Sequence, residues 1–291
     1  MERILYTTKN DYYGSFDASL IDAAIQTARL KLGGEWRFDG SDFLMIVDDD
    51  QTLRERRPDF YWITRTPSRA SVKEFRNAFL ENFIDKYYPM PTEDARVPDD
   101  KIEHFLQQYY AFCHNAIQML LTASINAYKW PILKEEIVEN ILEELGKFTE
   151  GVPHLQMMKQ GYSELQIPSN FSSDNATSEM MNNLFAIFND DNTSRLAGAL
   201  VAFETLAIRE YFAIEFYVRK LAEIKGLRID ENGTLMKYIK GHQTFEVEHS
   251  DHLAEAVDKC YAIHEVDQDS FEDGFAAVVH QLSTWWKSYL N

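Results

Sequence analysis

The sequence predicts an all-α protein in which a helical bundle, residues 71–291, follows a small N-terminal extension, residues 1–70. Beyond Ser71 the apolar residues recur with the helical period of about 3.6 residues almost throughout. Segments of strand character are confined to the extension, and Gly or Pro stands at or near several of the predicted helix ends. We therefore expect helices that bury their apolar faces against one another, with the extension packed on them.

The extension mixes helix and strand signals. Ser19–Leu32 has helical periodicity and is ended by Gly33 and Gly34. Asp42–Val47 and Phe60–Thr64 are short runs of β-branched and aromatic residues, which predict strands.

In the bundle, prolines, a glycine and a capping residue mark where successive helices begin and end. Pro89 stops the first helix, Asp99 is a cap for the second, and Pro131 opens the third, because proline is favoured in a first turn. Pro153 separates the third from the fourth, and Gly226 ends the longest. The predicted helices are Val72–Tyr88, Asp99–Tyr128, Ile132–Phe148, His154–Tyr162, Ser178–Asn189, Asn192–Lys225, Leu235–Ala262 and Ser270–Leu290.

Composition excludes several classes of function. The chain has 291 residues and a formal net charge of −18, which argues against nucleic acid and anionic membrane surfaces as partners. Its two cysteines, Cys113 and Cys260, form no disulfide or zinc-finger framework and fit a reducing cytosol. The N-terminus has no apolar signal region and no apolar run is long enough for a transmembrane helix, so we expect a cytoplasmic protein.

The helix predicted over Leu235–Ala262 carries an H-x3-E-x2-H pattern made by His242, Glu246 and His249. Successive helical residues are about 100° apart, so the three side chains project within roughly 60° of one another, in the middle of an apolar stripe. Burying such groups without partners is costly, and a metal ion would be a partner for all three. The alternative is a solvated face, or core histidines bonded to the backbone.

Two earlier helices each place a glutamate near an apolar face. In the helix Ile132–Phe148, helical projection puts Glu144 at the edge of that face and turns Glu143 to solvent. In Asn192–Lys225, Glu204 is the single charge in LAGALVAFETLAI and requires a cation or metal. The alternatives are a boundary glutamate reaching outward at position 144, and for Glu204 a buried ion pair with an arginine. The apolar face next to Glu144 is predicted to consist of Ile137, Val138, Ile141, Leu142, Leu145 and Phe148.

His154 follows Pro153 at the start of the next predicted helix and completes a set of six candidate ligands. Three carboxylates and three imidazoles suit two iron ions, with manganese as the alternative. Helical bundles build such sites from inward-facing residues on different helices. The candidate metal ligands are Glu144, His154, Glu204, His242, Glu246 and His249.

These motifs resemble the heme-oxygenase-like diiron oxidases, the CADD-like group. That group has a helix glutamate followed by a histidine, then a lone helix glutamate, then H-x3-D-x2-H. The matching segments here are ENILEELGKFTEGVPHL, ALVAFETLAI and HQTFEVEH, and QQYYAF at 107–112 is similar to the group's tyrosine-rich second helix. The resemblance spans roughly residues 71–290. Here the Glu144–His154 spacing is longer, and Glu246 stands in place of the aspartate.

The resemblance implies a heme-oxygenase-like fold and two Fe(II) ions that activate O2 to oxidise a substrate. That substrate would be a small or long-chain aliphatic carboxylate, such as a fatty acid, which is desaturated, hydroxylated or cleaved. Two alternatives stay open. One is a metal-free CADD-like protein-interaction module. The other is a hydrolase like thiaminase II, which shares the fold superfamily with the oxidase of pyrroloquinoline quinone synthesis and would use Cys113 or Cys260 as nucleophile. Without a recognisable base nearby, both cysteines are interpreted as small core residues. A homodimer also stays open.

Overall fold

The structure is a computed structural model that describes residues 3–7, 12–13, 35–38, 43–46, 60–64, 71–92, 95–147, 149, 151–168, 172–264 and 266–290. The chain divides into two compact units, residues 1–75 and 76–291. The predicted packing of residues 1–70 on the bundle stays a prediction. None of the helices in the described part of the chain is long and apolar enough to span a membrane.

The N-terminal unit contains short antiparallel strands. Strand β1 lies between β2 and β5, and β3 pairs with β4 in a separate two-stranded sheet. The predicted strands correspond to β4 and β5, whereas β1, β2 and β3 were not predicted. The predicted helix Ser19–Leu32 lies outside the described residues. The strands are β1 (Arg3–Thr7), β2 (Tyr12–Tyr13), β3 (Glu35–Phe38), β4 (Phe43–Ile46) and β5 (Phe60–Thr64).

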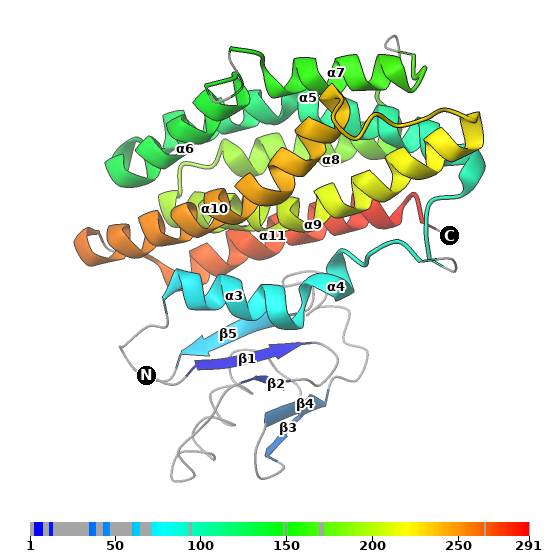
Figure 1. Cartoon of the computed structure of the whole chain (residues 1–291). Helices are drawn as coiled ribbons and strands as arrows, with labels where there is room; N and C mark the ends of the chain where they lie inside the picture. Colours follow the sequence, from blue (N-terminus) through cyan, green and yellow to red (C-terminus); the bar gives the residue numbers. More distant parts are fainter. Residues whose placement is uncertain are drawn as a thin grey trace. The chain divides into compact units, whose positions relative to one another are not determined.

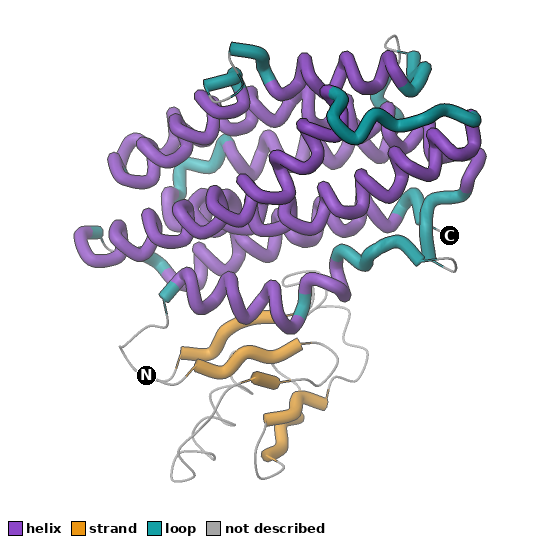
Figure 2. Tube along the Cα trace, in the orientation of Figure 1, coloured by secondary structure: helices purple, strands orange, loops and turns teal. Residues whose placement is uncertain are grey.

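All regular structure described in the second unit is helical, which confirms the predicted all-α bundle (Figures 1 and 2). Helix α8 begins earlier than predicted, because the side chain of Asp174 caps it by accepting the amide of Thr177 at 2.8 Å. The helices are α3 (Val72–Asn82), α4 (Ile84–Tyr87), η2 (Asp99–Lys101), α5 (Ile102–Asn126), η3 (Ala127–Lys129), α6 (Pro131–Glu144), α7 (His154–Glu164), α8 (Asn175–Phe188), α9 (Thr193–Lys225), α10 (Thr234–Ile263) and α11 (Gln268–Lys287).

Helix α9 is the centre of the bundle and packs against α10, α11, α5 and α8 (Figure 1). Its crossing with α11 depends on two glycines. A Cβ atom on Gly198 would lie 1.8 Å from the carbonyl oxygen of Phe271, and one on Gly274 would lie 1.8 Å from that of Arg195. The backbones of the two helices therefore touch at this point, which fixes the position of α9 along α11.

Helix α6 ends in a Schellman motif at Gly146, whose φ is +101°. The amide of Gly146 donates to the carbonyl of Glu143 at 2.8 Å, and that of Lys147 donates to the carbonyl of Leu142 at 3.0 Å. This motif terminates the helix four residues before the predicted end at Phe148 and leaves Glu143 and Glu144 in the last turn.

Candidate metal centre

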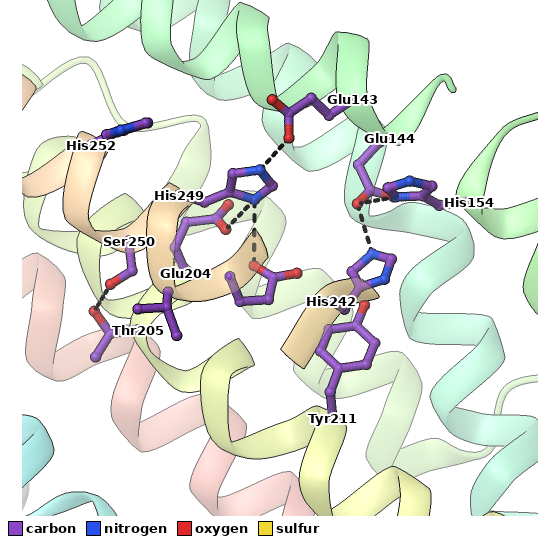
Figure 3. A network of polar contacts seen from close by, with 12 residues as sticks. Glu143, Glu144, His154, Glu204, Thr205, Tyr211, His242, His249, Ser250 and His252 are labelled. Carbon is purple, nitrogen blue, oxygen red and sulfur yellow. Dashed lines mark hydrogen bonds and ion pairs between the residues drawn. The ribbon is translucent and has the colours of Figure 1, made fainter. Parts of the chain in front are cut away.

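Four helices bring the six predicted ligands together. The middle of α10 supplies His242, Glu246 and His249, all buried. Helix α9 supplies Glu204, the last turn of α6 supplies Glu144, and the first residue of α7 is His154. Figure 3 shows that the side chains converge in two groups. In each group, one donor atom from every residue lies within 4.8 Å of the others.

The first cluster consists of Glu144, His154 and His242. The Oε1 atom of Glu144 lies 3.1 Å from Nδ1 of His154 and 3.2 Å from Nε2 of His242. The Nδ1 atom of His242 lies 2.8 Å from the carbonyl oxygen of Tyr238 and donates to it. That bond uses the proton on Nδ1, so Nε2 is the nitrogen that faces Glu144 and would be the one to bind a metal ion.

The second cluster consists of Glu204, Glu246 and His249. The Nδ1 atom of His249 lies 3.6 Å from Oε2 of Glu246 and 3.9 Å from Oε2 of Glu204. Its Nε2 atom faces away from both carboxylates. This cluster therefore offers two carboxylates and one imidazole, whereas the first offers one carboxylate and two imidazoles.

The second cluster sets two carboxylates against one imidazole, whereas in the first cluster two imidazoles face a single carboxylate. Burial and the nearby charge of Glu246 raise the pKa of Glu204 well above its ordinary value. Burial opposes a charge on His249, but its hydrogen bond with Glu246 and the charges of Glu204 and Glu246 outweigh burial and raise its pKa to about 10. Burial also opposes ionisation of Glu144, yet hydrogen bonds from His154 and His242 outweigh it and hold the pKa of Glu144 well below its usual range. A divalent cation in each cluster would meet the same demand for positive charge.

Glu143 corrects the sequence prediction. It was expected to face solvent, but its carboxylate bonds Nε2 of His249, and its side chain is only 18% exposed (Figure 3). The two glutamates in the last turn of α6 therefore face different clusters. Carboxylates bonded to the outer nitrogen of a metal-binding histidine orient its ring, and Glu143 is in that position.

The predicted apolar face of α6 is also wrong in phase. Val138, Leu142 and Leu145 are exposed, and the residues that the helix buries are Leu133, Ile137, Asn140 and Ile141. The buried stripe is centred between Ile137 and Asn140, so Glu144 continues it one turn further on, and Glu143 lies beside it, about 100° round the helix from Glu144. For that reason both carboxylates reach the interior.

A hydrogen-bonded network lies next to the second cluster and connects the helices that carry it. Thr205 and Ser250, which follow Glu204 and His249 in sequence, join their hydroxyl groups at 3.0 Å (Figure 3). The buried guanidinium of Arg76 donates to Ser250 and forms an ion pair with Asp251 at 3.1 Å. This network links α9 and α10 next to the candidate ligands Glu204 and His249.

Two other polar side chains of α9 and α10 lie outside the candidate ligand set. His252 is exposed and lies outside both clusters, with Nδ1 3.6 Å from Glu136. Glu215 accepts from Nε of Arg219 at 2.8 Å and forms a local ion pair with it, one turn apart on α9.

A cavity of about 60 Å³ adjoins the clusters. Its polar lining includes Glu144, Glu204, Glu246 and His249, and also Glu210, which the sequence patterns did not single out. Its remaining lining residues are Tyr109, Phe112, Cys113, Ala116, Leu120, Asn140, Phe203, Ala207, Tyr211, Tyr238 and Leu282. Glu210 belongs to no ligand-like spacing pattern, so only the folded arrangement reveals it.

The two cysteines differ in position. Cys260 is buried in α10, in agreement with its interpretation as a core residue, whereas Cys113 lines the cavity. Burial raises the pKa of the Cys113 thiol well above its ordinary value, and the charges of Glu210 and Glu144 raise it further. The thiol is therefore protonated at neutral pH, which disfavours a nucleophilic role.

The bundle is similar in fold to a CADD-like protein of unknown function from Nostoc punctiforme PCC 73102. One of its crystal structures shares 23% identity with a TM-score of 0.64, and covers 75% of this chain and 95% of that one. A second crystal structure of the same protein shares 21% identity with a TM-score of 0.61, over 75% and 91% of the two chains. These matches confirm the predicted CADD-like fold.

A TenA homologue from Pyrococcus furiosus matches with 16% identity and a TM-score of 0.49, over 74% of this chain and 93% of that one. No curated protein matches the sequence. Residues 86–290 match the family described as "Domain of Unknown Function with solved-structure structure (DUF3865)". Since this match spans most of the chain, the protein belongs to the DUF3865 family.

Proposed function

We propose that this protein is a non-heme diiron oxidase or oxygenase that uses O2 to oxidise a small aliphatic substrate. The proposal is carried by one observation, the pairing of two largely buried triads of carboxylate and imidazole donors beside a cavity. Hard carboxylates and imidazoles together suit iron or manganese, and two histidines with one carboxylate form a known iron-binding set.

The donor set fits two metal ions. Glu144, His154 and His242 would hold one, and Glu204, Glu246 and His249 would hold the other. When bound, the iron ions would supply the electrons and the open coordination positions that oxidation by O2 needs.

The side chains of the protein have separable tasks in this scheme. The carbonyl of Tyr238 keeps the proton of His242 on Nδ1, and Glu143 accepts from Nε2 of His249, so each imidazole presents its other nitrogen inward. Phe112, Leu120 and Phe203 give the cavity apolar walls that exclude water from the substrate. A volume of about 60 Å³ favours a small substrate over a long-chain fatty acid.

Anaerobic loading with Fe(II), followed by metal counting, tests the proposal. We expect about two Fe(II) per chain, as a two-metal site requires. Exposure to O2 should then oxidise the iron, which optical spectroscopy would detect. A chain that takes up no iron would refute the proposal.

Histidine variants provide the matched comparison. Bound metal should raise thermal stability by RT ln(1 + [L]/Kd), about 2.7 kcal/mol at a hundredfold excess over Kd. His249→Ala should lose most of the rise in melting temperature on adding Fe(II), whereas His252→Ala, an exposed histidine on the same helix, should keep it. Equal rises in both variants would mean that the α10 face is packing and not a ligand set.

A further inference from the structure

The cavity has a second polar end at Glu210, separate from the six ligands. The side chain of Glu210 is buried, with the residue 3% exposed, and it projects from α9 into the cavity lining. Its Oε1 accepts from the hydroxyl of Tyr88 at 2.7 Å, and its Oε2 accepts from that of Tyr109 at 3.4 Å. A carboxylate has about four acceptor sites, so these two bonds leave capacity for another donor.

The charge of Glu210 is not balanced by the protein. Among the described residues, no lysine or arginine forms an ion pair with it, and none lines the cavity. Burial raises the pKa of Glu210 to about 7, although the hydrogen bond from Tyr88 acts in the opposite direction. An incoming cation would therefore regain energy that burial of this carboxylate costs.

The other residues that line the cavity indicate which chemical group would accompany the cation. Phe112, Leu120 and Phe203 offer apolar surface, and the rings of Tyr109 and Tyr211 also line the cavity. Aromatic rings and a carboxylate together favour an ammonium group over an anion. A water-sized group needs about 10–15 Å³, so a cavity of about 60 Å³ holds roughly four such groups.

We propose that Glu210 binds the ammonium group of a small aliphatic amine, whose hydrocarbon part lies along Phe112, Leu120 and Phe203 towards the metal clusters. This inference rests on the proposed oxidase function, because the amine would be the substrate that the same site oxidises. The geometry separates binding of the amine, at Glu210, from binding of the metals.

Calorimetric titration of the full chain with n-propylammonium, propionate and 1-propanol tests the assignment. The wild type should bind n-propylammonium more tightly than either of the other two probes. Glu210→Gln keeps the shape and an acceptor for Tyr88 but removes the charge, and it should weaken n-propylammonium binding at least tenfold, equivalent to about 1.4 kcal/mol. Glu223→Gln, which changes an exposed carboxylate on the same helix, should bind like the wild type.

Folding and metal content are read in the same samples. Glu210→Gln should melt no lower than the wild type and take up as much Fe(II), because Glu210 is outside the ligand set. Undiminished amine binding by Glu210→Gln, or wild-type preference for propionate or propanol, would overturn the Glu210 assignment alone. Failure of every variant to take up iron would instead overturn the oxidase proposal.

Discussion

The bond between Glu143 and Nε2 of His249 makes a carboxylate outside the proposed ligand set part of the candidate metal centre. Glu143→Gln preserves size but weakens this charged acceptor, so the His249 ring should be held less firmly. We expect metal affinity to fall about 10–100-fold, the usual effect of losing such a partner. Competition with a chelator measures it. The control is Glu139→Gln, which changes an exposed residue one turn earlier that pairs with Lys147. Equal metal affinities for the two variants would show that Glu143 does not orient the His249 ring.

The buried carboxyl of Glu210 should make stability depend on pH in a direction opposite to that of most acidic groups. Its pKa is about 7 in the folded protein, above the ordinary 4.5, so the folded state binds the proton more tightly. The contribution of Glu210 to the free energy of unfolding is therefore greatest below pH 4.5. It declines between pH 4.5 and 7 and stays low above pH 7. The loss amounts to about 3 kcal/mol.

Unfolding by urea in the presence of a chelator checks this sign. Glu210→Gln removes the titration, so it should be more stable than the wild type at pH 8, and the advantage should shrink below about 1 kcal/mol at pH 5. An advantage that is the same at both pH values would show that Glu210 is not ionised above pH 7.

The touching backbones of α9 and α11 allow a test at the level of helices. Replacing glycine by alanine inside a helix normally stabilises it by about 1 kcal/mol. At Gly198, however, the added Cβ would overlap the carbonyl oxygen of Phe271. Gly198→Ala should therefore destabilise the protein by about 1–3 kcal/mol or more, since only a shift of α11 relieves the overlap.

Gly241→Ala is the matched substitution in α10. There the added Cβ would meet the ring of Phe245 at 3.2 Å, which can give way by a small movement. We expect this variant to be near neutral in thermal unfolding. A Gly198→Ala protein as stable as Gly241→Ala would mean that the α9–α11 crossing can widen without cost.

Helix boundaries explain which parts of the site the sequence could predict. The H-x3-E-x2-H pattern lies well inside α10, where rotation per residue is regular, and it correctly groups His242, Glu246 and His249 on the buried face. Glu143 lies in the last turn of α6, where the assumed face, built on Leu142 and Leu145, was out of phase. Gly146 was the available signal, because a helix that ends at this glycine has both glutamates in its last turn, where they oppose the helix dipole.

For the molecule as a whole, helical periodicity predicted the bundle and most of its helix ends, because amphipathic patterns and terminating glycines are local properties. Gly226 indeed ends α9, in the left-handed conformation. What local patterns could not predict is the pairing between distant helices. Glu210 illustrates this, since its hydrogen bonds come from Tyr88, just after α4, and from Tyr109 in α5. The cavity beside it is lined by residues of α5, α6, α9, α10 and α11.

The first cluster spans a long stretch of the chain, since Glu144 and His242 are 98 residues apart. A cation held between them would act as a removable cross-link, comparable to a disulfide in the conformational freedom that it takes from the unfolded chain. The cysteines, Cys113 and Cys260, are both free thiols and provide no such link. The connectivity of the folded chain would then depend on the supply of metal rather than on the redox state of the surroundings.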